Sequence, residues 1–286
     1  MDDAGPRGRL LRELDLAVVD LELTGLGHRD RICEIAIVRG RVGRVESRLQ
    51  ALCRPEVPMS PGALKVHRIS DAALTEAPRF ADLAADVAGM LDGAVLVAHN
   101  VPFDLGHLQH ELALAGVALP EAPTLDTLAI ARRLFAFPRN NLGEVCAALG
   151  VELTGAHRAL ADAEATFAVL GRMLDVLDPD GTLTLGELTD LVEALAPRSP
   201  LRLRQQRVLR EAYRDRRTVL LEYLSGAEPR AGAVLREVAI WFLRLPRVQG
   251  WCHLRAGERI FRLDRMISVR RGERPYEIPA DAVPRI

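Results

Sequence analysis

The stretch Leu16-Ala-Val-Val-Asp20-Leu-Glu22-Leu-Thr-Gly25 decides the fold of the first part of the chain. Its apolar run predicts a buried strand, and the glycine marks the turn that follows. Because side chains alternate along a strand, Asp20 and Glu22 point to the same face, about 6.6 Å apart. An acidic pair at a strand end is usually solvated, and burying it is costly unless cations neutralise it. Divalent cations prefer oxygen ligands, so the pair is a candidate metal site.

The residues that follow predict an α/β arrangement. Two strands joined between Gly40 and Gly43 form an antiparallel meander, after which helices and strands alternate. The expected strands are 32–39, 44–52, 94–98 and 124–126, and the expected helices begin near Ser60 and Ser70 and cover 80–91, 104–115, 127–135, 141–149 and 157–177.

Length and charge indicate two domains. The 286 residues contain strong breaks at Asp178-Pro-Asp-Gly181 and Ala196-Pro-Arg-Ser-Pro200. We therefore expect one domain over 1–178, a linker with a short helix over 179–200, and a second domain over 201–286. Residues 201–286 carry 19 arginines against 10 acids, a net charge of +9, whereas residues 1–200 carry 19 basic and 29 acidic residues, a net charge of −10. Codon bias explains why lysine occurs only at Lys65, but it does not explain this asymmetry, which suggests that the second domain attracts phosphates.

The second domain begins with a basic helix over 201–216. Five strand-like pieces follow at 219–224, 234–245, 250–254, 259–263 and 267–270. Short strands in that number predict a small β-barrel.

The cysteines and the hydropathy indicate the compartment. The chain shows no secretory signal and no apolar run of membrane-spanning length. We therefore expect a cytoplasmic protein with no membrane partner, whose cysteines are reduced and structural. These cysteines are Cys33, Cys53, Cys146 and Cys252.

Three further residues are candidates for chemistry. Asp104 follows an apolar strand and begins a helix, where an acid also stabilises the helix dipole. Asp162 lies in a helix among small apolar residues, although a helix acid is ordinarily solvated. His157, which opens that helix, is by itself more often a surface histidine. Each residue alone favours the structural interpretation.

Together these residues form a recognisable set. Three segments, Asp20-Leu-Glu22-Leu-Thr-Gly25, His99-Asn-Val-Pro-Phe-Asp104 and His157-Arg-Ala-Leu-Ala-Asp162-Ala, resemble the three motifs of the DEDD exonucleases. Histidine five residues before the last aspartate is typical of the subclass that includes the proofreading subunit of bacterial replicative polymerase and ribonuclease T. Leu125-Asp-Thr-Leu128 and Asn141-Leu142 are also similar to that family.

The resemblance implies a ribonuclease H-like fold with a mixed central sheet and a two-metal hydrolysis. Asp20, Glu22, Asp104 and Asp162 would hold two magnesium or manganese ions, and His157 would take the proton from the attacking water. Nucleoside 5'-monophosphates would leave the 3' end of a nucleic acid. We expect single-stranded 3' ends as the partner, with DNA favoured over RNA.

Three residues near the motifs need separate comment. Thr24, at the end of the first motif, is a candidate for nucleic-acid contact. Leu23 replaces the usual threonine and points away from the acids, so it alters packing rather than metal binding. Arg68 replaces glycine in the segment His67-Arg-Ile69, and because arginine enters left-handed backbone only at a cost, we expect a different turn there.

The second domain resembles the WYL domain, a small barrel related to Sm and SH3 folds. The match includes Tyr223, Arg236 and the segment Phe261-Arg-Leu-Asp-Arg265. Of the Trp-Tyr-Leu triplet that gives the domain its name, Trp251 is kept, whereas Cys252 and His253 replace the tyrosine and the leucine. The resemblance implies that basic residues bind nucleic acid or a nucleotide effector, although a solvated arginine face is the alternative. The candidates are Arg236, Arg255, Arg259, Arg262 and Arg265.

Two other interpretations of function stay open. The chain could be a nucleic-acid-responsive regulator whose exonuclease-like half only binds strand ends and does not cleave them. It could also be an oligoribonuclease or a nucleotide-trimming enzyme, because the same site would attack any phosphodiester. The intact acids favour an enzyme over a regulator.

Overall fold

The computed structural model describes residues 5–25, 27, 30–196, 200–224 and 233–285. The chain divides into two compact units, one formed by Met1–Leu128 with Arg139–Leu188 and the other by Ala129–Pro138 with Thr189–Ile286. The second predicted break, at 196–200, lies largely outside the described residues.

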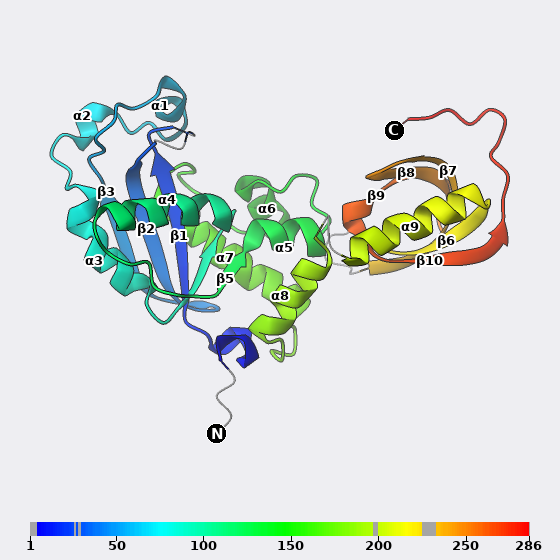
Figure 1. Ribbon diagram of the computed structural model, residues 1–286, viewed down its shortest axis with the longest axis horizontal. Helices are drawn as coiled ribbons and strands as arrows, with labels where there is room; N and C mark the ends of the chain where they lie inside the picture. The colour runs from blue at the N-terminus through cyan, green and yellow to red at the C-terminus, as the bar shows by residue number, and fades with distance from the viewer. Residues whose placement is uncertain (1–4, 26, 28–29, 197–199, 225–232, 286) are drawn as a thin grey trace. The chain divides into compact units, whose positions relative to one another are not determined.

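The first unit is built on a five-stranded mixed sheet in the order β3-β2-β1-β4-β5 (Figure 1). Its central strand β1 pairs antiparallel with β2 and parallel with β4, which confirms the predicted mixed sheet. The strands are β1 (Leu16–Leu23), β2 (Ile32–Arg41), β3 (Arg44–Leu52), β4 (Val95–Ala98) and β5 (Thr124–Asp126).

Helices cover both faces of this sheet. Alternate β1 residues, among them Val19 and Leu21, join a core cluster with residues of α3 and α4, while α7 contacts β1, β2 and β4. Figure 1 shows α3 and α4 in front of the sheet. The helices through this part of the chain are α1 (Pro61–His67), α2 (Asp71–Leu74), α3 (Phe80–Leu91), α4 (Val101–Leu114), α5 (Thr127–Leu134), α6 (Leu142–Leu149) and α7 (Ala159–Leu177).

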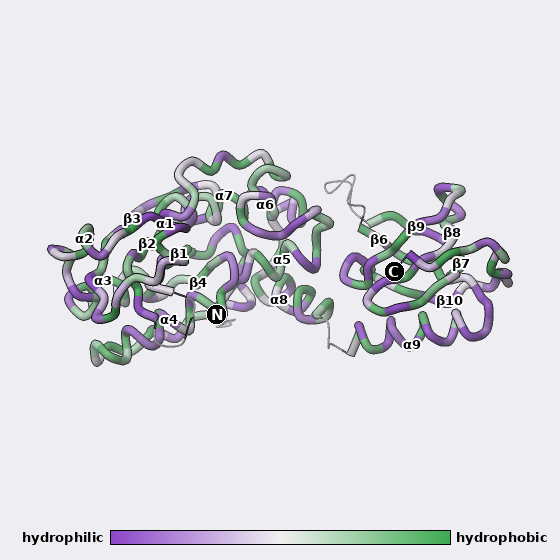
Figure 2. Tube along the Cα trace, turned by 90° about the horizontal axis from the view of Figure 1, so that it is seen from above, coloured by the Kyte–Doolittle hydropathy of each residue, from purple (hydrophilic) through white to green (hydrophobic). Residues whose placement is uncertain are grey.

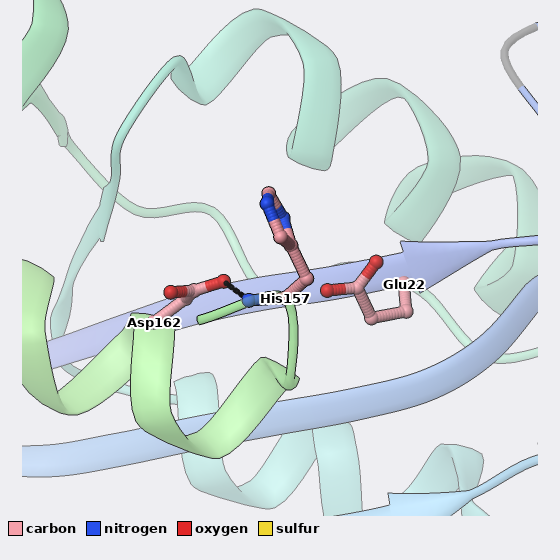
Figure 3. Close-up of side chains that lie close together, drawn as sticks. All are labelled: Glu22, His157 and Asp162. Carbon is pink, nitrogen blue, oxygen red and sulfur yellow. Dashed lines mark hydrogen bonds between the residues drawn. The ribbon is translucent and has the colours of Figure 1, made fainter. Parts of the chain in front are cut away.

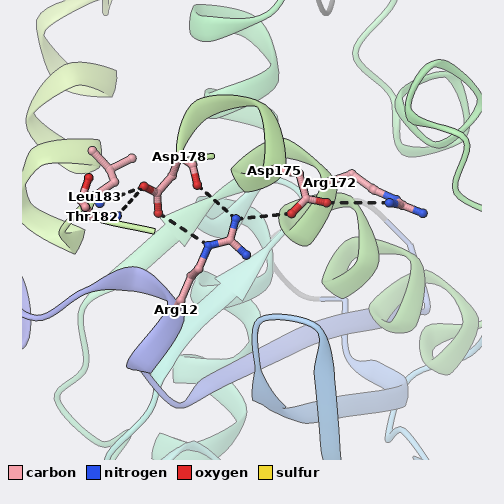
Figure 4. Close-up of polar contacts among 6 residues, drawn as sticks. All are labelled: Arg12, Arg172, Asp175, Asp178, Thr182 and Leu183. Atoms are coloured by element: carbon pink, nitrogen blue, oxygen red, sulfur yellow. Dashed lines mark hydrogen bonds and ion pairs between the residues drawn. The ribbon is translucent and has the colours of Figure 1, made fainter. Parts of the chain in front are cut away.

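A polar network ties the end of α7 to the start of the chain (Figure 4). The Asp178 carboxylate is buried and accepts hydrogen bonds from the N–H groups of Thr182 (2.7 Å) and Leu183 (3.0 Å). Arg12, in a 3-10 turn over Leu11–Glu13, forms ion pairs with Asp178 (3.8 Å) and Asp175 (3.3 Å). Residues just beyond Asp178 are therefore held against the first unit, ahead of α8 (Leu185–Ala194).

The second unit contains a five-stranded antiparallel sheet in the order β10-β6-β7-β8-β9. In the described strands β9 and β10 are the two edges, so the predicted barrel is an open sheet. Helix α9 contacts β6, β7 and β10 and adds Leu209 and Ala212 to their apolar cluster, which covers a face that a closed barrel would bury by itself. The elements are α9 (Pro200–Arg214), β6 (Arg217–Leu224), β7 (Ala233–Arg244), β8 (Arg247–Cys252), β9 (Gly257–Arg262) and β10 (Met266–Pro275), with a 3-10 turn over Leu263–Arg265.

Hydropathy along the chain follows these layers. Figure 2 shows hydrophobic colour along β1 and β4 and mainly hydrophilic colour along α9. One arginine of α9 is nevertheless internal: Arg202 is 1% exposed and donates to the carbonyls of Leu195 (2.9 Å) and Leu263 (2.6 Å).

All four cysteines are buried free thiols. Within the described segments, no helix combines the length and the hydropathy needed to cross a bilayer.

Candidate active site

Two acids of the site come from the end of β1. Asp20 and Glu22 lie on the face opposite to Leu21 and Leu23, which are buried in the core. Glu22 is only 9% exposed, and Asp20 is half-buried. The strand alternation that the sequence predicts therefore brings the two carboxylates to one place.

The third acid comes from the first turn of α4. Asp104 is 7% exposed and follows a sharp turn in which Asn100 adopts a φ of 107°. Asn100 donates its backbone N–H to the Asp126 carboxylate (3.1 Å), which also accepts the N–H of Leu128 (2.9 Å). The Asp126 carboxylate therefore stabilises the turn that positions Asp104 in the site.

The fourth acid and the histidine come from the start of α7 (Figure 3). Asp162 is 9% exposed, and its carboxylate accepts the backbone N–H of His157 (2.9 Å). His157 has a φ of 65°, a left-handed conformation that is strained for a residue with a side chain. One ring nitrogen of His157 and one carboxylate oxygen each of Glu22 and Asp162 lie within 4.8 Å of one another. The exposed imidazole therefore stands beside two of the acids.

Burial and mutual repulsion shift the titration of all four acids. Burial raises the pKa of Glu22 to about 7 and that of Asp104 to about 8, with neighbouring carboxylates adding to the effect. Burial also raises the pKa of Asp162, and it raises that of Asp20 strongly, helped by Asp104 and Asp162. Four close carboxylates are unfavourable as anions unless positive charge joins them.

A fifth carboxylate, Glu34, lies behind this cluster and was not predicted. It faces Glu22 across the β1–β2 ladder and is 0% exposed. Burial would raise its pKa, but hydrogen bonds from Arg158, Gln50 and the Ala159 N–H lower it overall. The signal in the sequence is a single acid inside the apolar strand Ile32-Cys-Glu-Ile-Ala-Ile-Val38.

An apolar pocket of about 520 Å³ opens beside Glu22. Its walls include Leu23, Ala63, Val66 and Phe103, so the residue just before Asp104 belongs to the site. The pattern of acids alone did not indicate this role for Phe103. The pocket places apolar surface next to carboxylates, so an anionic part of a ligand could approach the carboxylates only through bound cations, while its apolar part contacts the walls.

The expected difference in the turn at Arg68 is wrong. Arg68 caps the C-terminus of α1 with a φ of 61° and a ψ of 18°, the conformation that glycine usually supplies. Its N–H donates to the Leu64 carbonyl. The turn is therefore kept by arginine at the cost of a strained backbone rather than rebuilt.

Thr24 is placed inside the protein. Its side chain is 0% exposed, and its hydroxyl donates to Asp30 (3.0 Å) and accepts the N–H of Arg31 (3.0 Å). Its hydrogen bonds stabilise the turn after β1, so we assign Thr24 a structural role in place of the predicted nucleic-acid contact.

The five predicted arginines do not all lie together, but three of them, Arg236, Arg262 and Arg265, approach Tyr223. Arg236 is 6% exposed, its guanidinium stands 5.9 Å from the Tyr223 ring centre, and its buried Nε has no hydrogen-bond partner among the residues that the structure describes. Arg262 is paired with Asp264 through two hydrogen bonds (3.0 and 2.6 Å), and Arg265 donates to the Phe137 carbonyl (3.0 Å). Arg259 and Arg262 lie on opposite faces of β9.

Arg255 lies exposed in the turn between β8 and β9. Of the five predicted arginines, Arg236 therefore has the most enclosed surroundings.

The comparison with protein families now decides the class of this chain. The profile of the family described as RNase_T, Exonuclease, matches residues 17–170, more than half of the chain. The chain belongs to this exonuclease family. The match contains the four acids and His157, so the predicted enzyme class is confirmed at the level of the family. Residues 205–271 match the WYL domain, which confirms the second resemblance.

Relatives and solved structures of this exonuclease family are similar over different lengths. The DNA polymerase III PolC-type of Bacillus cereus is 36% identical over 173 residues, which are 59% of this chain, and that of Bacillus subtilis is 36% identical over 169 residues, which are 58%. The match covers 12% of each polymerase. The crystal structure of E. coli Exonuclease I with a dT13 oligonucleotide matches with a TM-score of 0.54 at 18% identity, covering 84% of this chain and 55% of that chain. This last likeness shows the fold. Membership of the family implies dependence on divalent metal ions.

Proposed function

We propose that this chain is a metal-dependent 3'-5' exonuclease that releases nucleoside 5'-monophosphates from nucleic-acid ends. The observation that carries the proposal is the approach of four acids from β1, α4 and α7, each with a raised pKa and three of them buried, together with an exposed imidazole beside Glu22 and Asp162. Such crowding is unfavourable for folding alone, and it is expected where cations complete a site.

The donor set fits two hard divalent cations. Asp20, Glu22, Asp104 and Asp162 offer only oxygen atoms, which magnesium and manganese prefer. When bound, these ions would neutralise the carboxylates and polarise the phosphodiester. Asp20 and Glu22 belong to β1, Asp104 to α4 and Asp162 to α7, so regular elements position all four.

His157 is the proposed proton acceptor. Among the described residues its ring has no hydrogen-bond partner, and it lies next to Glu22 and Asp162. A free imidazole in that position can take the proton of an attacking water.

We expect His157→Ala to lower single-turnover cleavage by about 10²- to 10⁴-fold, the range for loss of a general base. Binding of the strand should be retained, which a Kd measured in calcium would check. A loss below tenfold would remove His157 from this role.

The apolar pocket beside Glu22 is the proposed place of the terminal nucleoside. A base and sugar need apolar walls, and Val66 and Phe103 supply them. The scissile phosphate would then lie toward the acids. Because the phosphodiester is common to both nucleic acids, we take the preference for DNA from the relatives, which include DNA polymerases and an exonuclease crystallised with a DNA oligonucleotide.

The test is degradation of 5'-labelled single-stranded DNA, duplex DNA and RNA with magnesium or manganese, beside Asp104→Ala. We expect a ladder of shortened labelled strands from single-stranded DNA, and no cleavage with Asp104→Ala. Binding of strand ends without turnover by the wild type under every condition would instead favour the end-gripping regulator.

For the WYL unit we infer a separate role as a binding site for a nucleotide effector. The observation that supports it is Arg236, a buried guanidinium with an unpaired Nε against the Tyr223 ring. A phosphate beside this arginine would satisfy the unpaired donor. Calorimetry with nucleoside mono- and triphosphates should show binding that Arg236→Met removes and the exposed control Arg255→Met leaves unchanged. Equal binding by both variants would contradict this role.

A further inference from the structure

We propose that the ion pair between Glu34 and Arg158 is a positioning device that sets the His157 imidazole against the acidic cluster. Neither residue would touch the substrate. The proposal rests on the proposed function, because it assigns a role to residues behind the same site.

The first observation is the completeness of the Glu34 environment. Arg158 donates to both carboxylate oxygens, from Nε (3.0 Å) and from a terminal nitrogen (2.8 Å). Gln50 donates to one oxygen (2.9 Å), and the Ala159 N–H donates to the other (3.1 Å). Donors from β3 and from the start of α7 thus meet on one buried residue of β2, which fixes where α7 begins.

The second observation is how His157 is held. In the part of the chain that the structure describes, its ring makes no hydrogen bond, so its backbone decides where the ring stands. That backbone is left-handed, and its N–H is bonded to Asp162. The Asp162 N–H is bonded in turn to the Arg158 carbonyl (3.1 Å). Any displacement of Arg158 would therefore move both the imidazole and the fourth acid.

The third observation is charge. Glu34 faces Glu22 across the β1–β2 ladder, and Arg158 is the cation paired with Glu34 behind the acids of the site. Arg158, paired with Glu34 behind the acidic cluster, stabilises the cluster without occupying the position of a metal ion. A lysine in that position would keep the positive charge but lose the bidentate hydrogen bonding to the Glu34 carboxylate.

The experiment is a double-mutant cycle with Arg158→Lys and His157→Ala. In the wild-type background we expect Arg158→Lys to lower kcat by about 10- to 100-fold, the scale of an ångström misplacement, with KM nearly unchanged. In the His157→Ala background the same change should cost clearly less than it does in the wild type, because one of the two groups that Arg158 positions is gone and only the part that acts through Asp162 remains. Glu34→Gln, which keeps the volume, should behave as Arg158→Lys does.

The matched control is Arg48→Lys. Arg48 pairs with Glu164 (2.6 Å), so it also ties β3 to α7, but through a half-exposed ion pair that does not include the acids of the site. Wild-type kcat is expected for this control. The proposal is overturned if Arg158→Lys and Glu34→Gln are as active as the wild type, or if their losses are undiminished when His157 is already alanine. A wild type that cleaves nothing would refute the proposed function instead.

Discussion

At the scale of single residues, the acidic cluster makes the protein without metal sensitive to pH. The pKa of Glu22 is about 7 and that of Asp104 about 8, both above the ordinary values of 4.5 and 3.8. The folded state therefore binds more protons than the unfolded state between about pH 4 and pH 8, so stability falls as pH rises through that window.

We expect the Tm in EDTA to fall between pH 5.5 and 8.5, and magnesium or manganese to restore most of the loss at the upper end. Asp104→Asn should weaken this pH dependence, because it removes one titrating group, while it abolishes turnover. Comparing the variant with the wild type isolates the group from other titrations, such as that of His67, whose pKa burial lowers. A variant and wild type with parallel Tm curves in EDTA would contradict the assignment.

Arg68 gives a second prediction at this scale. A side chain in left-handed backbone costs about 1–2 kcal/mol, and glycine loses part of that gain through the entropy of its unfolded chain. Arg68→Gly should therefore raise the free energy of unfolding by about 0.5–1 kcal/mol in urea titrations. Arg68→Ala keeps the Cβ atom and should bring no gain, and a destabilised glycine variant would show that the arginine side chain itself supports the turn.

At the scale of elements, Asp178 shows how the first unit is closed after α7. Replacing it with alanine leaves the N–H groups of Thr182 and Leu183 without their acceptor. We expect Asp178→Ala to cost about 2–3 kcal/mol of unfolding free energy, the range for a lost buried acceptor. Asp175→Ala removes a half-exposed partner of Arg12 and should cost less than about 1 kcal/mol. Equal costs would show that the Asp178 hydrogen bonds do not hold this segment.

At the scale of the whole molecule, residues 201–286 carry the net positive charge, and exposed arginines of α9 contribute to it. Arg204, Arg207 and Arg210 are exposed on this helix at three-residue spacing, and none has a hydrogen bond or ion pair with another described residue. They span about 9 Å along one side of the helix. This row is therefore better placed for phosphate contacts than Arg262, which Asp264 neutralises.

Replacing these three arginines with glutamine should weaken the binding of long single strands and lower the salt slope of log K by about 2, since each lost phosphate contact contributes about 0.7. Cleavage of dinucleotides should be unchanged. The control carries the same loss of charge at Arg244, Arg247 and Arg255, which lie at strand ends and turns. If the two triple variants have equal slopes, net charge rather than α9 sets the affinity.

The sequence by itself determined most elements and predicted which acids form the candidate site. Strand alternation placed Asp20 and Glu22 on one face, and the spacing of His157 and Asp162 put both at one helix start, because these relations depend only on local geometry. Local periodicity also indicated the strands of the second unit, although the barrel predicted from them is an open sheet.

Only the tertiary structure decided which distant groups meet. Arg158 is paired with Glu34, 124 residues away, and the buried Nε of Arg236 has no hydrogen-bond partner among the described residues, although Arg236 looks like any other arginine in the sequence. Helix α9 covers the face that a barrel would have closed, so the second sheet stays open. Such outcomes follow from strand register and burial between segments far apart in the chain, where the free energy of a charge depends on its surroundings and not on its neighbours in sequence.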